Sequence, residues 1–424
     1  MNPVRLALIG AGDRGNAYAR WALAHPGRAR FVAVAEPDPD RRARFAAAHG
    51  IGLAAQHDDW RQLLDDADLA VDAVVIATQD AGHADPAVAA AQRGLHIMLE
   101  KPLAPTPQEC VRIVDAAREA DVMLAVCHVL RYAPYTRLVK HLIDSGAIGD
   151  VVSVQHHEPV GFWHQAHSFV RGNWRREDLS SFMLLAKSCH DMDWLQHIVG
   201  RDIARVSSFG GLRHFRPENR PAGAADRCLD CAVEPDCPYS APRLYRDRLA
   251  RGEHRWPLSV VTPVFTEQAL TEALREGPYG RCVYACDNDV VDHQVVAMEF
   301  DGGVTASFTM NAFNTGGHRR TRVFGTRGEL VCDAVSVTVH DFTTGTATSH
   351  DPQTAGGADA AGGHGGGDAG LMDAFTAAVA TGDRARILSG PAQTLNSHLA
   401  TFAAEQARHE GTVVTVARPA ALAG

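Results

Sequence analysis

The sequence has little that would suit a nucleic-acid or membrane partner. Lys and Arg number 41 against 50 Asp and Glu, a formal net charge of −9, whereas binding to phosphate backbones needs a local surplus of basic residues. No hydrophobic run approaches the roughly 20 residues that a membrane-spanning helix requires. No signal-peptide pattern follows Met1. We therefore expect a cytoplasmic protein that binds neither nucleic acid nor membrane.

The chain also lacks the features of a small or disordered protein. Its 424 residues exceed the size at which one hydrophobic core usually divides, so we expect two domains. Hydrophobic residues make up 46% and charged residues 21%, which is the composition of an ordinary folded protein. In a reducing compartment its nine cysteines are expected to be metal ligands or buried small residues before disulfides.

The first 126 residues alternate short apolar strands with helical segments. Strands are predicted at 5–9, 31–35, 73–77, 96–99 and 122–126, and helices at 17–24, 41–49, 86–93 and 107–120. Apolar strands joined by helical crossovers are typical of a doubly wound parallel sheet that is buried on both faces. We therefore predict a Rossmann domain over residues 1–126.

Beyond residue 126 the pattern changes to alternating apolar and polar positions. Strands are predicted at 150–156, 205–209, 294–300, 304–310, 320–324 and 335–342, with covering helices at 134–145 and 184–199. Residues 211–288 are rich in Pro, Arg and Cys with little periodicity, which indicates an insertion, and further helices are predicted within 371–409. The expected fold is α/β: the Rossmann sheet, then an α+β domain over 127–424 with a largely antiparallel open sheet.

A glycine-rich turn follows the first strand and opens the first helix. It reads Gly10-Ala11-Gly12-Asp13-Arg14-Gly15. The first glycine permits the tight turn, the second lets the backbone approach a pyrophosphate, and the third lets helix and strand pack closely. The helix N-terminus then presents amides and a positive dipole end to the phosphates. The turn predicts a dinucleotide site.

Glu36 closes the second strand, 21 residues after Gly15. A carboxylate at this position can accept hydrogen bonds from the ribose hydroxyls and repels a 2′-phosphate. We therefore expect NAD rather than NADP as the cofactor. Arg41 and Arg42 leave NADP as the second choice, although they fall inside the following helix.

Several further motifs resemble one known family. They are Thr78-Gln79-Asp80-Ala81-Gly82-His83, Glu100-Lys101-Pro102 after a strand, Arg131 within 128–134, His190-Asp191-Met192-Asp193, and His364 in 364–368. With the glycine turn they resemble the glucose-fructose oxidoreductase / inositol dehydrogenase / MocA family over nearly the whole chain except the insertion. The resemblance implies a substrate cleft between the domains, and a homodimer or homotetramer formed through the sheet of the second domain.

The same resemblance implies roles for individual residues. Thr78, Asp80 and His83 would lie along the nicotinamide half of the cofactor, with Glu100 and Lys101 also beside it. Lys101 would polarise the substrate oxygen, since a nearby ammonium stabilises a developing alkoxide. His190 would be the acid/base, because an imidazole suits proton transfer near neutral pH.

One position departs from the family pattern. The family carries Asp one helical turn before the acid/base histidine, where this chain has Ala186 followed by Lys187. Lys187 and His190 lie three residues apart, on adjacent parts of one helix face. Two cations in one site would lower each other's pKa and favour an anionic or strongly polar substrate. The departure leaves open a different substrate, a different reaction or lost catalysis.

A dense group of aromatic and hydrogen-bonding side chains follows residue 158. Such side chains stack on sugar faces and bind paired hydroxyls, and Arg131 and His364 are expected to join them at the substrate. The candidates in this group are Trp163, His164, His167, Arg171, Asn173 and Trp174. A subunit interface, where Trp and Arg are also enriched, is the alternative.

The insertion carries five cysteines: Cys228, Cys231, Cys237, Cys282 and Cys286. The Cys228–Cys231 spacing suits one tetrahedral metal, with Cys237 and either Cys282 or Cys286 completing four sulfurs. A structural zinc would pin a loop-rich segment that lacks a core. An iron-sulfur cluster has the same ligands, and unliganded thiols are the third interpretation because the spacing matches no standard zinc pattern.

Together the motifs predict an NAD-dependent oxidoreductase that transfers hydride from a sugar, polyol or sugar derivative. Two other interpretations remain open at the level of sequence. One is a glycosidase in which NAD is recycled within each turnover, and the other is a non-catalytic protein that senses NAD or sugar. Net formation of NADH would distinguish a dehydrogenase from both.

Overall fold

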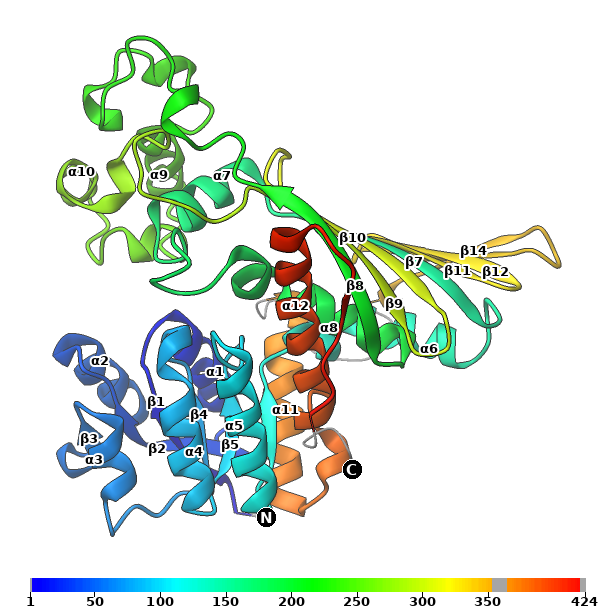
Figure 1. Cartoon of the computed structure of the whole chain (residues 1–424). Coiled ribbons are helices and arrows are strands. Elements are labelled where there is room, and N and C mark those ends of the chain that lie inside the picture. Colours follow the sequence, from blue (N-terminus) through cyan, green and yellow to red (C-terminus); the bar gives the residue numbers. More distant parts are fainter. Residues whose placement is uncertain (1, 353–363, 420–424) are drawn as a thin grey trace.

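A computed structural model describes residues 2–352 and 364–419. The chain forms two sheets, a six-stranded sheet (sheet A) in the N-terminal part and a nine-stranded sheet (sheet B) beyond it, with a helical insertion at one end of sheet B (Figure 1). Sheet A is wholly parallel, and in sheet B only the β7–β10 pair is parallel. The predicted fold class is confirmed.

Sheet A has the strand order β3-β2-β1-β4-β5-β6. Its strands are β1 (Val4–Ile9), β2 (Ala29–Ala35), β3 (Gln56–His57), β4 (Ala73–Ile76), β5 (His96–Leu99) and β6 (Leu124–Val126). Alternate residues of one strand enter different cores, since Ala7 and Ile9 join one cluster while Leu6 and Leu8 join another. Burial on both faces explains the continuous apolar runs in the sequence.

Helices cover both faces of sheet A. Those of the N-terminal part are α1 (Asp13–Ala24), α2 (Pro39–His49), α3 (Trp60–Asp65), α4 (Ala84–Gln92) and α5 (Pro107–Glu119). A helix from the far end of the chain, α11 (Gly367–Thr381), packs on α1 and β1 and buries Leu371 and Phe375 in the same cluster as Leu6 (Figure 1). The Rossmann core is therefore completed by C-terminal residues.

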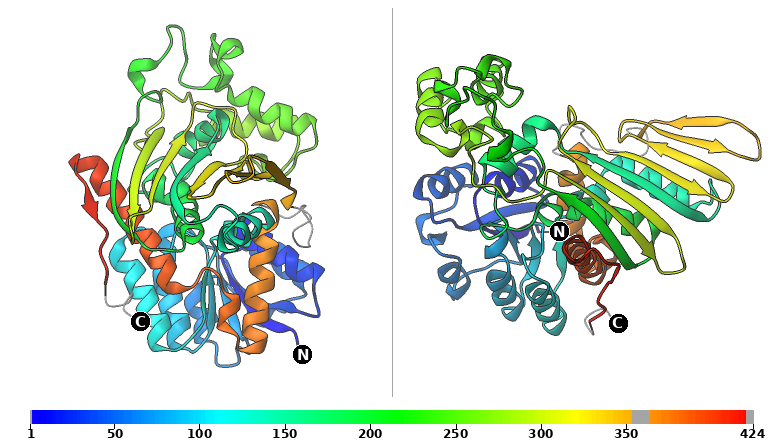
Figure 2. Two further views of the ribbon diagram at one scale, coloured as in Figure 1. Left: turned by 90° about the vertical axis from the view of Figure 1, so that its right-hand side faces the viewer. Right: turned by 45° about the horizontal axis from the view of Figure 1, so that its top comes forward.

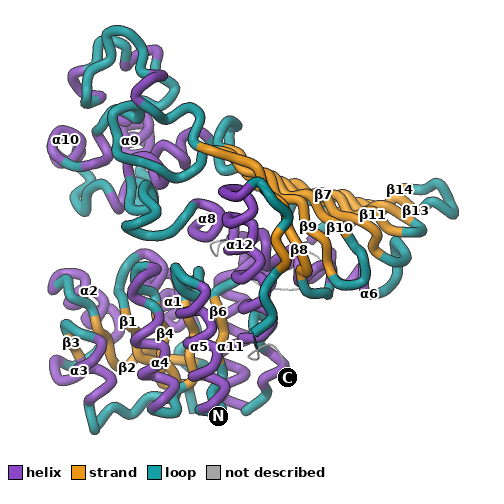
Figure 3. The backbone as a smooth tube through the Cα atoms, viewed as in Figure 1, coloured by secondary structure: helices purple, strands orange, loops and turns teal. Residues whose placement is uncertain are grey.

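Sheet B has the order β14-β13-β12-β11-β7-β10-β9-β8-β15. Its strands are β7 (Val151–Pro159), β8 (Ile203–Gly211), β9 (His293–Phe300), β10 (Thr305–Asn311), β11 (Arg320–Gly325), β12 (Gly328–Cys332), β13 (Val337–Asp341), β14 (Ala347–His350) and β15 (Val414–Thr415). Buried and exposed residues alternate along β9 and β10. One face lies on helices α6 (Pro134–Asp144), α8 (Met183–Val199) and α12 (Pro391–Glu410), and the other stays open (Figure 3).

The insertion leaves β8 and returns to its neighbour β9 at the same end of sheet B (Figure 2). It holds two helices that the sequence did not reveal, α9 (Ala241–Ala250) and α10 (Glu267–Glu276), around a small core of its own that includes Tyr245 and Leu270. Their short length and the surrounding Pro and Arg mask the helical periodicity. The insertion is thus a compact subdomain.

Among residues 2–352 and 364–419, no helix combines the length and the apolar character of a membrane span.

Helix α12 joins the two parts of the molecule, because it packs on α5, α8 and β8. His398 on α12 is fully buried, and its Nε2 accepts a hydrogen bond from the amide of Leu103 at 2.9 Å while Nδ1 donates to the carbonyl of Thr394 at 2.9 Å. Burial, followed by the neighbouring His128, lowers the pKa of His398 to about 3. The neutral ring therefore fixes the loop that follows Lys101.

This environment predicts that acid destabilises the fold. The unfolded chain binds a proton at His398 below about pH 6.5, whereas the folded chain excludes it down to about pH 3. Stability then falls as pH drops, by about 2 kcal/mol between pH 7 and pH 5 for this residue. The buried His167 and the half-buried His197, with pKa values of about 3 and about 4, act in the same direction.

Urea unfolding at pH 7 and pH 5 measures the effect. The matched variant is His398→Gln, whose amide oxygen can still accept the Leu103 hydrogen bond but binds no proton. Its stability should depend less on pH than that of the wild type. Equal pH dependence in the two proteins would contradict the assignment.

Candidate active site

The glycine turn forms the expected cradle between β1 and α1. Gly10 has φ +95, and a Cβ there would lie 2.7 Å from the carbonyl oxygen of Ala77. A Cβ on Gly15 would lie 2.3 Å from the carbonyl oxygen of Gly10, so helix and turn are in direct contact. Gly12, the N-cap of α1, faces open space instead. These residues fit a dinucleotide, because the open position is the one that a pyrophosphate approaches.

Glu36 lies at the end of β2 beside this turn and is 6% exposed. Its carboxylate accepts hydrogen bonds from the amides of Ala11 at 2.7 Å and Asp38 at 3.0 Å. The carboxylate is therefore held in place by the backbone of the glycine turn. Each oxygen has a second lone pair with which it can accept from a ribose hydroxyl. Asp13, in the first turn of α1, is exposed.

Arg14 and Glu100 bind each other. The Arg14 guanidinium pairs with Glu100 at 2.6 Å and with Asp368 of α11 at 2.8 Å. Burial alone would lower the pKa of Arg14, but Tyr18, Glu100 and Asp368 raise it well above its ordinary value. Glu100 also accepts from the amide of Lys101 at 2.9 Å. The pair thus sets the backbone from which Lys101 projects.

Lys101 and His190 come from opposite parts of the molecule and meet at one helix. Lys101 follows β5, and its Nζ donates to the carbonyl of Ala186 on α8 at 2.7 Å. His190 lies one turn further along α8 and is 6% exposed. Lys101 therefore contacts the helix that carries His190, one turn before that residue.

A buried ion pair lies behind His190. The ring of His128 is 5.7 Å from that of His190, and its Nε2 lies 3.6 Å from Asp193. Burial, then the charges of Arg131 and Lys101, lower the pKa of His128 well below its usual range. Arg131 is 2% exposed and binds both oxygens of Asp193 at 2.7 Å. Arg131, predicted to bind substrate, is thus fully engaged with protein partners.

Lys187 is neutralised by a carboxylate that the sequence did not single out. Its Nζ lies 3.0 Å from Glu158 of β7, whose other oxygen lies 3.2 Å from Arg319. Arg319 also pairs with Asp191, and this contact, after the opposing effect of burial, lowers the pKa of the Asp191 carboxyl. The expectation of two uncompensated cations is therefore corrected, because the Lys187 charge has its own partner.

The loop after β4 is fixed by hydrogen bonds of its own side chains. Thr78 donates to the carbonyl of Gly82 at 3.0 Å, and His83 is fully buried with Nδ1 2.8 Å from the carbonyl of Pro102. Asp80 accepts from the hydroxyls of Ser180 and Ser181 at 3.0 and 3.2 Å. Asp80 and His83 therefore link this loop to its neighbours and do not point into free space.

Trp163 and His164 form an aromatic wall that the insertion completes. Their rings are stacked at 5.5 Å, and Trp256 of the insertion lies 5.6 Å from Trp163 and 4.9 Å from His164. Arg248 lies over the Trp163 ring at 4.6 Å. Burial, then the charges of Lys187, His167 and Lys101, lower the pKa of His164 well below its usual range. The His164 ring is therefore neutral, and the positive charges of Lys187 and Lys101 help to keep it so.

The other expected wall residues take different places. His167 is buried with Nδ1 2.7 Å from the hydroxyl of Tyr245, and Arg171 is buried and donates to the carbonyls of Arg281 and Tyr239. Both hold the insertion. Asn173 is exposed, and Trp174 packs against the main core. The side chain of His364 lies outside the described residues.

The cysteines of the insertion do not form a closed zinc site. Four of them, Cys228, Cys231, Cys237 and Cys282, line one cavity, while Cys286 is not among its lining residues. No three of the five sulfurs, all in the described part of the chain, lie within 4.8 Å of one another. The other four cysteines, Cys110, Cys127, Cys189 and Cys332, are buried as expected.

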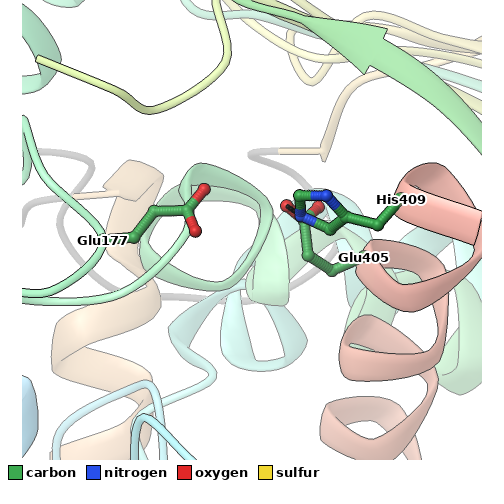
Figure 4. Close-up of side chains that lie close together, drawn as sticks. All are labelled: Glu177, Glu405 and His409. Atoms are coloured by element: carbon green, nitrogen blue, oxygen red, sulfur yellow. Dashed lines mark ion pairs between the residues drawn. The ribbon is translucent and has the colours of Figure 1, made fainter.

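One group of carboxylates and histidine approaches metal-ligand spacing. The side chains of Glu177, Glu405 and His409 lie within 4.8 Å of one another (Figure 4). Glu405 already pairs with Arg408 and lies 3.3 Å from His409, and Glu177 has a pKa raised by burial and then by Glu405. Because Glu405 is already paired with a cation, the cluster resembles a surface ion-pair group more than a cation site.

Sequence reasoning missed Glu158, Arg319 and Trp256. Glu158 lies on β7 and pairs with Arg319, which directly precedes the neighbouring strand β11, and Trp256 comes from the insertion. No local motif marks them, because only the tertiary fold brings them to the site. The adjoining HHE segment, with three titratable residues at 156–158, is the one signal that could have drawn attention to Glu158.

Comparison with known proteins identifies the family of this chain. A profile described as an oxidoreductase family with an NAD-binding Rossmann fold matches residues 4–128, and the C-terminal alpha/beta domain of the same family matches residues 140–416. The chain belongs to the Gfo/Idh/MocA oxidoreductase family. The expected resemblance is confirmed.

Relatives in the family carry several names. Levoglucosan dehydrogenase of Pseudarthrobacter phenanthrenivorans is 30% identical over 47% of this chain and 52% of its own length. Inositol 2-dehydrogenase 2 of Saccharopolyspora erythraea is 31% identical over 48% and 56%. A 2,7-anhydro-N-acetylneuraminate hydratase of Escherichia coli is 30% identical over 35% and 39%. The chain thus spans about half the length of the curated relatives that it matches.

Solved structures share the fold over nearly the whole chain. A levoglucosan dehydrogenase in complex with NADH and levoglucosan has a TM-score of 0.71 at 21% identity, covering 98% of this chain and 100% of that one. An oxidoreductase of Agrobacterium radiobacter with NAD+, L-tartaric acid and magnesium has a TM-score of 0.69 at 16% identity, covering 98% and 99%. At these identities the likeness shows the fold alone.

Proposed function

We propose that the chain is an NAD-dependent dehydrogenase that oxidises a hydroxyl of a sugar, polyol or sugar derivative. The observation that carries the proposal is the contact of Lys101 with the Ala186 carbonyl of α8, one helical turn before His190. The glycine turn and Glu36 would hold the dinucleotide at the carboxyl ends of strands β1 and β2 of sheet A, the sheet whose strand β5 precedes Lys101. The names of several relatives support the substrate class.

The chemistry divides between the two residues. NAD, when bound, supplies the hydride acceptor. His190 removes the hydroxyl proton of the substrate as the carbon is oxidised to a carbonyl. Lys101 exchanges its hydrogen bond to the Ala186 carbonyl for one to the substrate oxygen, where its charge stabilises the developing alkoxide. The net charge of the protein is the same before and after the reaction once His190 has released the substrate proton to water.

The substrate is inferred to be polar and uncharged. Lys187 is paired with Glu158, so this part of the site offers both a donor and an acceptor instead of a free positive charge. Trp163 and Trp256 add flat apolar faces beside it. Donor, acceptor and aromatic face together suit a ring that carries several hydroxyls.

The open face of sheet B supports a homo-oligomer. Phe209 on β8 and Val295 on β9 are paired across the strands and are 70% and 42% exposed. Large apolar side chains on an open sheet mark an interaction surface. We propose that a second copy covers this face.

The first test removes each member of the central pair. His190→Ala is expected to lower kcat by about 10²–10⁴-fold, because it removes a positioned base. Lys101→Ala should lower kcat at least as far. NADH formation is followed spectrophotometrically over a panel of sugars and polyols, with the exposed His340→Ala as a control that should match the wild type. Full activity in His190→Ala would contradict the role of His190 as the base. Glycoside cleavage without net NADH formation would identify a glycosidase that recycles NAD within each turnover instead.

The second test addresses the Lys187–Glu158 pair. Lys187→Met removes a substrate contact but leaves Glu158 paired with Arg319, so the fold should persist. KM is expected to rise more than kcat falls, as for a residue that binds ground state and transition state alike. Lys140→Met, which breaks an exposed pair with Asp144 on α6, is the matched control. A fall confined to kcat would show that Lys187 acts in the chemical step.

The third test concerns the choice of cofactor. Calorimetry should show tighter binding of NAD than of NADP, because the Glu36 carboxylate repels a 2′-phosphate. Glu36→Gln keeps an oxygen that can accept from the Ala11 amide but removes the negative charge. The difference between the NAD and NADP affinities should therefore be smaller in this variant. NADP binding equal to or tighter than NAD in the wild type would contradict the prediction.

A further inference from the structure

The cavity in the insertion is ringed by thiols that come from distant parts of the chain. Cys228, Cys231 and Cys237 stand on two short 3-10 turns, η6 (Cys228–Asp230) and η7 (Glu234–Asp236), or directly after them. Cys282 arrives from beyond α10 because Arg227 and Arg281 form an isolated antiparallel bridge. The Cys282 amide also donates to the carbonyl of Asp226 at 2.8 Å. The backbone itself therefore carries four sulfurs to one cavity.

This arrangement distinguishes Cys282 from Cys286 as the fourth member. Cys282 lines the cavity with the other three. Cys286 is not among its lining residues, and its thiol donates to the backbone carbonyl of Cys282 at 3.2 Å. Sequence spacing alone left these two cysteines equivalent, and the bridge at Arg281 separates them.

A buried cation beside the cavity lacks a matching anion. Arg171 is 1% exposed and lines the cavity. Its partners among the described residues are the carbonyls of Arg281 and Tyr239 and, at 3.5 Å, the sulfur of Cys228, while its Nη1 has no hydrogen-bond partner. A guanidinium taken out of water without a carboxylate is costly. Negatively charged sulfur ligands would compensate it.

We propose that Cys228, Cys231, Cys237 and Cys282 ligate one metal centre in this cavity, with Arg171 as its buried counter-cation. Around a single zinc the sulfurs lie about 2.3 Å from the metal and about 3.8 Å from one another. Here no three lie within 4.8 Å, and they leave a cavity of about 20 Å³. A cavity of this volume has room for one ion but not for the several iron and sulfide atoms of a cluster, so the favoured occupant is a single zinc ion that draws the four thiols together.

The test measures metal content and needs no turnover, so it is independent of the proposed dehydrogenase activity. The full chain is purified without air and without chelator, and Fe, Zn and acid-labile sulfide are determined per chain. We expect a colourless protein with about one Zn per chain. About four Fe with matching sulfide, in a brown protein, would support the four-thiolate centre but replace the single ion by a cluster. Absence of both metals with all thiols titratable would overturn the proposal.

Variants test the ligand set. Cys228→Ser and Cys282→Ser should each retain less than a tenth of the wild-type metal, whereas Cys286→Ser, from the same insertion, should retain all of it. Arg171→Gln should lose metal faster to a chelator. NADH binding, measured by calorimetry, shows whether a variant is folded, and chelator treatment of the wild type serves where a serine variant does not fold. Equal loss in Cys286→Ser and Cys282→Ser would refute the assignment of Cys282.

Discussion

The docking of the loop after β5 onto the helices of the second part is the contact on which the rest of the site depends. Lys101 reaches the Ala186 carbonyl of α8, and the amide of Leu103 binds His398 of α12. Glu100, fixed by Arg14, sets the start of the same loop. Four consecutive residues, 100–103, therefore anchor sheet A to helices α8 and α12 of the second part. A shift of this loop would separate Lys101 from His190 without altering either.

Charge is distributed in the site so that each buried ion has a partner. Lys187 is balanced by Glu158, and Arg319 by Glu158 and Asp191. Unpaired buried charges would be costly, and a bound polar substrate can exchange with such pairs without leaving an ion bare. Ala186 stands where the resemblance implies an Asp, and the carboxylate of Glu158 reaches the same helix from sheet B through Lys187.

The sequence predicted those features whose causes are local. Periodicity located five of the six strands of sheet A and missed the two-residue β3. The glycine turn, Glu36 and Glu100-Lys101-Pro102 each identified a position by its place at a strand end. Features that depend on long-range packing could not be predicted in this way. Completion of the Rossmann core by Phe375 of α11, or the meeting of Trp256 with Trp163, joins residues far apart in the chain. The helices of the insertion, ten residues each, escaped because the surrounding segment is rich in Pro, Arg and Cys.

The insertion and the proposed substrate wall share one helical segment. The π-helix η4 (Gln165–Arg171) follows Trp163 and His164 directly, and its His167 and Arg171 bind Tyr245 and the carbonyls of Tyr239 and Arg281. The wall is therefore positioned from behind by the subdomain that contains the cysteine cavity. A metal centre that fixes Cys228 and Cys282 would also fix this helix, because Arg171 of the helix contacts the Cys228 sulfur and the carbonyl of Arg281. An insertion without a large core of its own can thus help to shape a site that it touches directly only through residues such as Trp256.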